Sequence, residues 1–180
     1  MAMPGKIDGV DLAVWRSASG QVHAWGDRCP HRGMRLSHGF VRGETLACIY
    51  HGWQYGEDGG CTSIPAHPQL TPPKTICAKT YNCVEQDGLI WVALTDTAGA
   101  PADLPAATPV RSLQINASRQ KTAAHFGNAD AAVLRQGDIT LVVQSKDART
   151  CAVHVLTVSD PKEASRWIEA QRAEIEGEAA

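Results

Sequence analysis

Four side chains of the kind that bind transition metals constrain this 180-residue chain most strongly. Cys29 and His31 form a C-x-H motif, and after a sixteen-residue gap Cys48 and His51 form a C-x-x-H motif. Each short motif supplies one thiolate and one imidazole, and both are common ligands of transition metals. A fold that uses them together must bring two separate loops to one inorganic group.

The residues around the four donors indicate a Rieske [2Fe–2S] cluster. The first loop reads CPHRG from Cys29, and the second reads CIYHGWQY from Cys48. In a Rieske centre two cysteines bind one iron and two histidines bind the other, which raises the reduction potential above that of an all-cysteine cluster. A glycine closely follows each histidine, as expected of loops that pass near an inorganic core, because glycine has no Cβ. The expected chemistry is one-electron transfer.

From about residue 8 to residue 94 the chain resembles the Rieske non-haem iron oxygenases. Besides the two loops, the resemblance rests on Val14-Trp15-Arg16, Asp27-Arg28 and Ile64-Pro65-Ala66. It implies that the cysteines hold the inner iron, that the histidines hold the outer iron and that a third loop around Pro65 covers the cluster. The expected cluster-binding residues are Cys29, His31, Cys48, His51, Arg32, Trp53 and Tyr55.

A structural zinc site is the alternative, since two cysteines and two histidines also form a tetrahedral zinc set. Zinc fingers usually pair like ligands and carry the histidines on a helix, whereas each loop here holds one of each. Glycine and proline beside the ligands also disfavour a helix. The pattern therefore favours the cluster.

Respiratory Rieske proteins resemble this site but add a disulfide between the two loops, at positions that correspond to Met34 and Tyr50 here. Trp53 stands where those proteins place a serine hydroxyl that donates to a bridging sulfur, although Tyr55 is able to donate to a cysteine sulfur. We therefore expect a potential towards the lower end of the range of about −150 to +300 mV for such centres. Without the stapling cysteines, a reducing compartment is expected, with four further cysteines reduced and mostly buried. These are Cys61, Cys77, Cys83 and Cys151.

Composition and charge exclude several other classes of function. The formal charge of −2 and the pI near 6.4 give no general attraction to nucleic acid or to an anionic membrane. No stretch has the length and apolarity of a membrane span, and the first residues lack the apolar region of a signal peptide, so a cytoplasmic protein is expected. The segment from Gly56 to Gly60 has the wrong spacing for a nucleotide-binding loop, which argues against flavin or nicotinamide.

Residues 1–95 are expected to form an all-β Rieske domain, a small antiparallel β-sandwich with two cluster-binding loops. Alternating hydrophobic residues bounded by turn signals predict its strands. The expected strands cover residues 10–15, 21–25, 40–41, 45–48 and 88–94. Residues 96–110 have the composition of a linker.

A small α+β domain is expected over residues 111–180. Its strands are predicted at 112–115, 139–143 and 150–156, with a hairpin turn at 145–149. Asp160 fits a helix N-cap and Pro161 the first helical position, which predicts a helix to about Glu176. This segment weakly resembles the last strands and last helix of the oxygenase catalytic domain.

The family's mononuclear Fe(II) site is not expected in this chain. In the family that the chain resembles, this iron is bound by a helix with the pattern D-x-x-H-x-x-x-x-H. The second half of this chain contains His125 and His154, and neither has another histidine at helical spacing. An iron site that combines these two with a carboxylate stays open as an alternative. The available carboxylates are Asp130, Asp138 and Asp147.

The expected function is that of the electron-transfer component of a non-haem iron oxygenase, with the catalytic iron on a partner chain. The expected assembly is with an oxygenase partner subunit or as a homo-oligomer. The expected electron donor is a ferredoxin or reductase. The alternative is a free-standing Rieske ferredoxin-type carrier. Arginines near the loops either form a docking face for an acidic donor or belong to an ordinary solvated surface. They are Arg16, Arg28, Arg32, Arg35 and Arg42.

Overall fold

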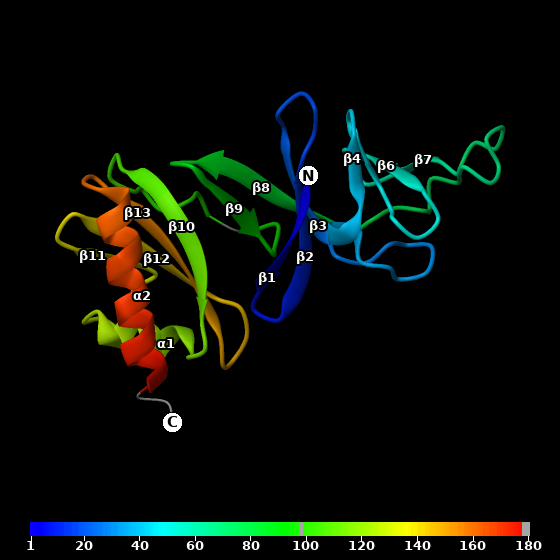
Figure 1. Ribbon diagram of the computed structural model, residues 1–180. Coiled ribbons are helices and arrows are strands. Elements are labelled where there is room, and N and C mark those ends of the chain that lie inside the picture. The colour runs from blue at the N-terminus through cyan, green and yellow to red at the C-terminus, as the bar shows by residue number, and fades with distance from the viewer. Residues whose placement is uncertain (98, 178–180) are drawn as a thin grey trace. The chain divides into compact units, whose positions relative to one another are not determined.

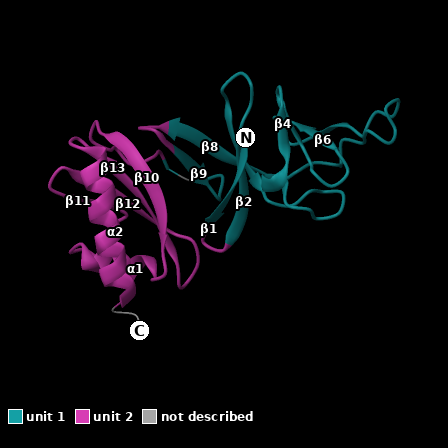
Figure 2. Ribbon diagram, in the orientation of Figure 1, with its two compact units in different colours: residues 1–6, 10–85, 90–99 teal, residues 7–9, 86–89, 100–180 magenta. Residues whose placement is uncertain are grey.

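The computed structural model describes residues 1–97 and 99–177, which form mainly antiparallel β-sheet with helices near the C-terminus (Figure 1). Two compact units divide the chain (Figure 2). The first unit comprises residues 1–6, 10–85 and 90–99, and the second comprises residues 7–9, 86–89 and 100–180. In the described residues, no helix is long and apolar enough to cross a membrane.

A five-stranded sheet runs in the order β1-β2-β3-β8-β9. Its strands are β1 (Ala2–Ile7), β2 (Val10–Arg16), β3 (Val22–Gly26), β8 (Thr80–Gln86) and β9 (Leu89–Ala93). The β2–β3 hairpin and strand β9 lie where the sequence predicts strands. Strands β1 and β8 were not predicted, because both are largely polar or half-exposed and carry little hydrophobic periodicity.

The second sheet positions the second metal-binding motif. Its order is β4-β5-β6-β7, with β4 (Phe40–Arg42), β5 (Thr45–Ala47), β6 (Gln54–Gly56) and β7 (Cys61–Ser63). The C-x-x-H loop connects β5 to β6, and its ends are joined by the pairing of Ala47 with Gln54. The C-x-H loop follows β3 and leads to the short 3₁₀ helix η1 (Leu36–His38).

The core of the first unit reaches directly to both loops. Trp15, Trp25 and Tyr55 are almost fully buried, together with Leu36 and Leu46. Cys29 and Cys48 belong to the same buried cluster. The two thiols are therefore fixed by hydrophobic packing of the domain, since burial of large apolar side chains supplies most of the stability of such a core.

The second unit is a four-stranded sheet, in the order β10-β13-β12-β11, with two helices. Its elements are β10 (Thr108–Ile115), α1 (Arg119–His125), β11 (Val133–Gln136), β12 (Ile139–Ser145), β13 (Cys151–Thr157) and α2 (Pro161–Gly177). The predicted α+β character and the β12–β13 hairpin are confirmed. Strand β10 begins at Thr108, inside the segment expected as linker, because its first residues pair with the end of β13.

Helix α2 begins as its sequence predicts. The Lys162 N–H donates to Asp160 Oδ1 at 2.8 Å, and Pro161 is the first helical residue. Ala164, Ile168 and Ile175 are buried against the sheet and helix α1. Helix α1 and strand β11 were not predicted, since each is too short to show a clear period. Ser118 caps α1 by accepting from the Lys121 N–H at 3.2 Å.

Candidate metal centre

The two loops share one backbone arrangement although they lie in different parts of the fold. In the first loop, the Cys29 N–H donates to Met34 O and the Gly33 N–H donates to Cys29 O, both at 2.8 Å. In the second loop, the N–H and C=O of Cys48 make the corresponding two bonds, with the residues five and four positions later, at 2.9 Å. Each cysteine therefore anchors a closed turn that presents its histidine.

A glycine with positive φ makes each turn possible. Gly33 has φ +71° and Gly52 has φ +70°, a conformation that L-residues with a Cβ rarely adopt. Around Gly33 the space is open, whereas a Cβ on Gly52 would lie 3.2 Å from Cγ of Pro65. The segment around Pro65 thus packs against the second loop, where sequence reasoning placed a third loop.

The thiols face the protein interior. Cys29 is 4% exposed and Cys48 is 2% exposed. Burial raises the pKa of the Cys48 thiol, and its contact with Cys29 raises it further. Tyr55 Oη lies 3.1 Å from Cys29 Sγ. Burial first, and then this contact, keep the pKa of Tyr55 far above its usual value, so its O–H remains a donor for a thiolate sulfur.

The imidazoles lie together on the more exposed side. The ring centres of His31 and His51 are 4.6 Å apart in an edge arrangement. Trp53 stacks on His31 at 4.1 Å with an interplanar angle of 6°, and Tyr50 lies over His51 at 3.9 Å. Desolvation lowers the pKa of His31, and the neighbouring His51 and Arg32 lower it further. The ring is therefore neutral near pH 7, the form that binds metals.

An unpartnered nitrogen indicates where a metal would bind. His31 Nδ1 is shielded from solvent and makes no hydrogen bond within the part of the chain that the structure describes. A buried polar nitrogen in this state is costly unless a further group satisfies it. The donors are arranged as two separate pairs, the thiols of Cys29 and Cys48 in contact with each other and the imidazoles of His31 and His51 in contact with each other. This arrangement fits a two-iron cluster better than a single zinc ion.

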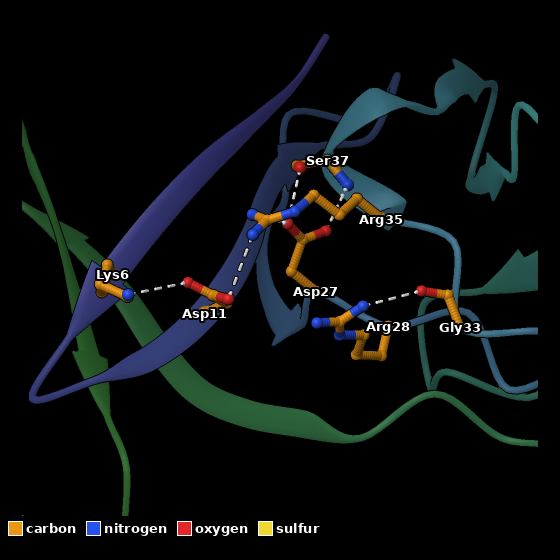
Figure 3. A network of polar contacts seen from close by, with 7 residues as sticks. All are labelled: Lys6, Asp11, Asp27, Arg28, Gly33, Arg35 and Ser37. Carbon is orange, nitrogen blue, oxygen red and sulfur yellow. Dashed lines mark hydrogen bonds and ion pairs between the residues drawn. The ribbon is translucent and has the colours of Figure 1, made fainter.

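A polar network beside the first loop was not predicted. The carboxylate of Asp27 is buried and contacts Arg35 and Ser37 on the far side of the loop (Figure 3). The sequence shows an aspartate two residues before the first ligand, but nothing in its spacing reveals the partners. Arg28 donates to Gly33 O at 3.2 Å in the same region.

The arginines near the loops differ in how they are held. Arg16 forms a bidentate ion pair with Glu85, with both distances at 2.8 Å, and Arg35 pairs with Asp27 and Asp11. Arg32 and Arg42 are exposed. Of the arginines considered for docking, Arg16 and Arg35 therefore contribute to internal ion pairs.

The histidines and cysteines outside the two motifs have surroundings of their own. His125 Nε2 is 2.9 Å from Gln171 Oε1 of α2, and His154 Nδ1 is 2.7 Å from Ser112 Oγ of β10. All six cysteines are free thiols. The expectation that the four additional cysteines are mostly buried is wrong, because Cys77 is exposed, two are half-buried and only Cys151 is buried.

Comparison with known proteins identifies the domain that carries the two loops. Residues 2–82 match the family of Rieske [2Fe-2S] domains. Residues 2–82 therefore form a Rieske [2Fe–2S] domain. Curated relatives show which kinds of protein contain a similar domain.

Three curated relatives show the range of similarity. Oxidoreductase NdmD of Pseudomonas putida is 44% identical over 97 residues, which is 53% of this chain and 16% of the relative. The 4beta-methylsterol monooxygenase of Methylococcus capsulatus is 46% identical over 94 residues, 50% of this chain and 25% of the relative. Methylxanthine N1-demethylase NdmA of P. putida is 46% identical over 68 residues, 38% of this chain and 19% of the relative. Over about half of its length or less the chain is thus similar to proteins named as an oxidoreductase, a monooxygenase and a demethylase, and it spans at most a quarter of the length of these relatives.

Solved structures show that the fold similarity extends over both units. NdmA of P. putida CBB5 superposes with a TM-score of 0.78 at 19% identity, covering 97% of this chain and 73% of that chain. Dicamba monooxygenase gives 0.77 at 18% identity, covering 98% and 81%. At these identities the similarity concerns the fold alone.

Proposed function

We propose that this chain is the Rieske electron-transfer component of a non-haem iron oxygenase that hydroxylates or demethylates a small organic substrate. Cys29 and Cys48 would hold the inner iron of a [2Fe–2S] cluster, and His31 and His51 the outer iron. A ferredoxin or reductase supplies the electrons in the cytoplasm, and a mononuclear iron on a partner chain receives them.

The opposite exposure of the two donor pairs carries this proposal. The thiols lie in the hydrophobic core, whereas the imidazoles touch each other at the more solvent-accessible side. When bound, the cluster supplies reversible one-electron transfer. An imidazole at the exposed side gives an approaching partner the shorter route to an iron, and the buried side keeps the sulfur ligands away from water.

Three side chains of this protein would act on the centre without supplying an iron ligand. Tyr55 donates its O–H towards the Cys29 sulfur and so stabilises the thiolate. Trp53 covers one face of His31 and fixes the plane of the ring. Arg32 is exposed next to His31 and presents a positive charge beside the electron-transfer edge.

The second unit would serve as a scaffold or subunit contact derived from the oxygenase catalytic domain. The fold similarity to two Rieske oxygenases over nearly the whole chain supports this part of the proposal. His125 and His154 each bond to a side chain of their own unit, and the proposal gives neither of them the role of an iron ligand.

Metal and sulfide analysis of the purified chain tests the proposal. We expect two irons and two acid-labile sulfides per chain, with visible absorption that bleaches on reduction by dithionite. Zinc without sulfide would contradict the cluster, and a third iron would contradict the assignment of the mononuclear iron to another chain. Reduction by NADPH with a ferredoxin reductase and a [2Fe–2S] ferredoxin, at a rate that falls with salt, then tests the expected donor.

A further inference from the structure

A buried carboxylate closes the first cluster loop from behind. Asp27 is 1% exposed and lies two residues before Cys29. Its Oδ1 accepts from the Ser37 N–H at 2.7 Å, and its Oδ2 accepts from Ser37 Oγ at 2.8 Å and from Arg35 Nη1 at 3.2 Å. All three bonds join the residue before the loop to residues after it, so they span both Cys29 and His31.

The same network continues outward to the β1–β2 hairpin. Arg35 Nη2 lies 3.3 Å from Asp11 Oδ2, and Asp11 Oδ1 lies 3.5 Å from Lys6 Nζ. Positive and negative charges therefore alternate from the partly exposed Lys6 to the buried Asp27, as Figure 3 shows. Asp27 is also held through its backbone, whose N–H donates to Asp11 O at 3.0 Å.

The burial of the Asp27 carboxylate has an energetic cost that its bonding partners have to offset. A buried carboxylate is strongly disfavoured unless it is paired and hydrogen-bonded. An apolar residue at the same position would avoid that penalty, but it would not tie residue 27 to residues 35 and 37. Groups that orient metal ligands through such bonds commonly change metal affinity ten- to a hundred-fold when removed.

We propose that Asp27 is a positioning residue for the first cluster loop, which sets the orientation of Cys29 and His31 by clamping Arg35 and Ser37 across it. This inference rests on the proposed cluster site. Arg35 neutralises the carboxylate and Ser37 supplies the two shortest bonds. The three bonds of the clamp involve neither Cys29 nor His31, so the clamp acts through the loop.

The test compares the wild-type chain with Asp27→Asn, Ser37→Ala and Asp11→Asn, each loaded with the cluster. Asp27→Asn keeps the size of the side chain but turns an amide donor towards Arg35 or Ser37. Ser37→Ala removes one of the three bonds, and it covers the case in which Asp27→Asn fails to fold. Asp11→Asn is the matched control, because it removes the outer ion pair of Arg35 and leaves the clamp intact.

Two readouts separate positioning from general stability. We expect chelator-driven iron loss about ten- to a hundred-fold faster for Asp27→Asn, a smaller increase for Ser37→Ala, and a rate within about two-fold of wild type for Asp11→Asn. Pulsed EPR of the reduced cluster should show an altered coupling of one histidine nitrogen in Asp27→Asn. Val22→Ala, at a buried position of the same unit outside the buried cluster that holds the two thiols, calibrates how much iron loss follows from lower stability alone.

The outcomes distinguish this inference from the proposed function. A wild-type chain that binds no iron and sulfide would contradict the cluster itself. A loaded wild type with Asp27→Asn unchanged in iron loss and nitrogen coupling would overturn the clamp alone. The clamp would also be overturned if Asp27→Asn lost iron only as fast as a Val22→Ala variant of equal thermal stability and its nitrogen coupling were unchanged.

Discussion

The two cluster loops adopt the same turn but are held in place by different kinds of interaction. The first loop lies between a strand and a 3₁₀ helix and is closed by the buried Asp27 with Arg35 and Ser37. The second loop connects two paired strands, β5 and β6, and is covered by the segment around Pro65. One loop is thus held by charges and hydrogen bonds, and the other by a sheet and by packing.

This difference shows how a small β domain builds one site from two kinds of support. A sheet fixes its connecting loop directly, because the strand pairing sets the distance between the loop ends. The first loop leaves the end of β3 and is not closed by paired strands. Side-chain hydrogen bonds therefore have to hold its ends together. Trp53 links the two, since it belongs to the second loop and stacks on a histidine of the first.

The largest effect is expected from the ligands, where the two loops should be equivalent. Cys29→Ala and Cys48→Ala should each abolish the cluster, because one iron would lose half of its protein ligands. Visible absorption and iron content measure this. Cys77→Ser, at an exposed thiol, is the control and should retain a full cluster. Retention of cluster in only one of the two cysteine variants would break the equivalence of the loops.

The turn glycines should separate the two kinds of support. Gly33→Ala and Gly52→Ala both force an L-residue into positive φ, which costs about 1 to 2 kcal/mol. Gly52→Ala should cost about 1 kcal/mol or more beyond that, since its Cβ would press on Pro65 while the space around Gly33 is open. Urea unfolding of the cluster-free variants measures the difference. Equal losses would show that the segment around Pro65 yields without cost.

The contact between the loops should have a smaller energy. Trp53→Leu removes the ring that stacks on His31 and should lower the free energy of unfolding by about 1 kcal/mol, whereas Trp53→Phe should restore most of it. Tyr50→Leu, at an exposed ring over His51, is the matched control and should change stability less. A Trp53→Leu variant as stable as Tyr50→Leu would argue against the stack as a link.

A stability effect of similar size is expected from the hydrogen bond between Tyr55 and Cys29. Tyr55→Phe should cost about 1 kcal/mol, the usual net value of one hydrogen bond. It should also lower the midpoint potential, because a donor to a cysteine sulfur stabilises the more negative reduced cluster. A redox titration compares it with wild type. An unchanged or higher midpoint would contradict the assigned donor role.

The sequence predicts those parts of the molecule that repeat a short-range pattern. The β2–β3 and β12–β13 hairpins and the helix after Asp160 follow from alternation and capping. The motif residues also indicate which side chains meet at the two loops. Strand β8 is not predicted from the sequence, because its half-exposed polar residues become ordered by pairing with β3, which is distant in sequence.

The clamp formed by Asp27, Arg35 and Ser37 is not predicted from the sequence for a related reason. Asp27 and Ser37 are ten positions apart, and neither their spacing nor their types differ from those of a solvated loop. Only the fold shows that the carboxylate is buried and that its bonds cross the ligand segment. Charged residues near a motif are therefore poorly assigned from sequence, as Arg16 and Arg35 also show.

The ligation of the outer iron tests the central claim most directly. We predict that pulsed EPR of the dithionite-reduced chain, produced with ¹⁵N-labelled histidine, detects two histidine nitrogens bound to a [2Fe–2S] cluster. Replacing either His31 or His51 by Ala should remove the two-nitrogen pattern. A reduced cluster without coupled histidine nitrogen, or a chain that holds zinc and gives no signal, would contradict the account.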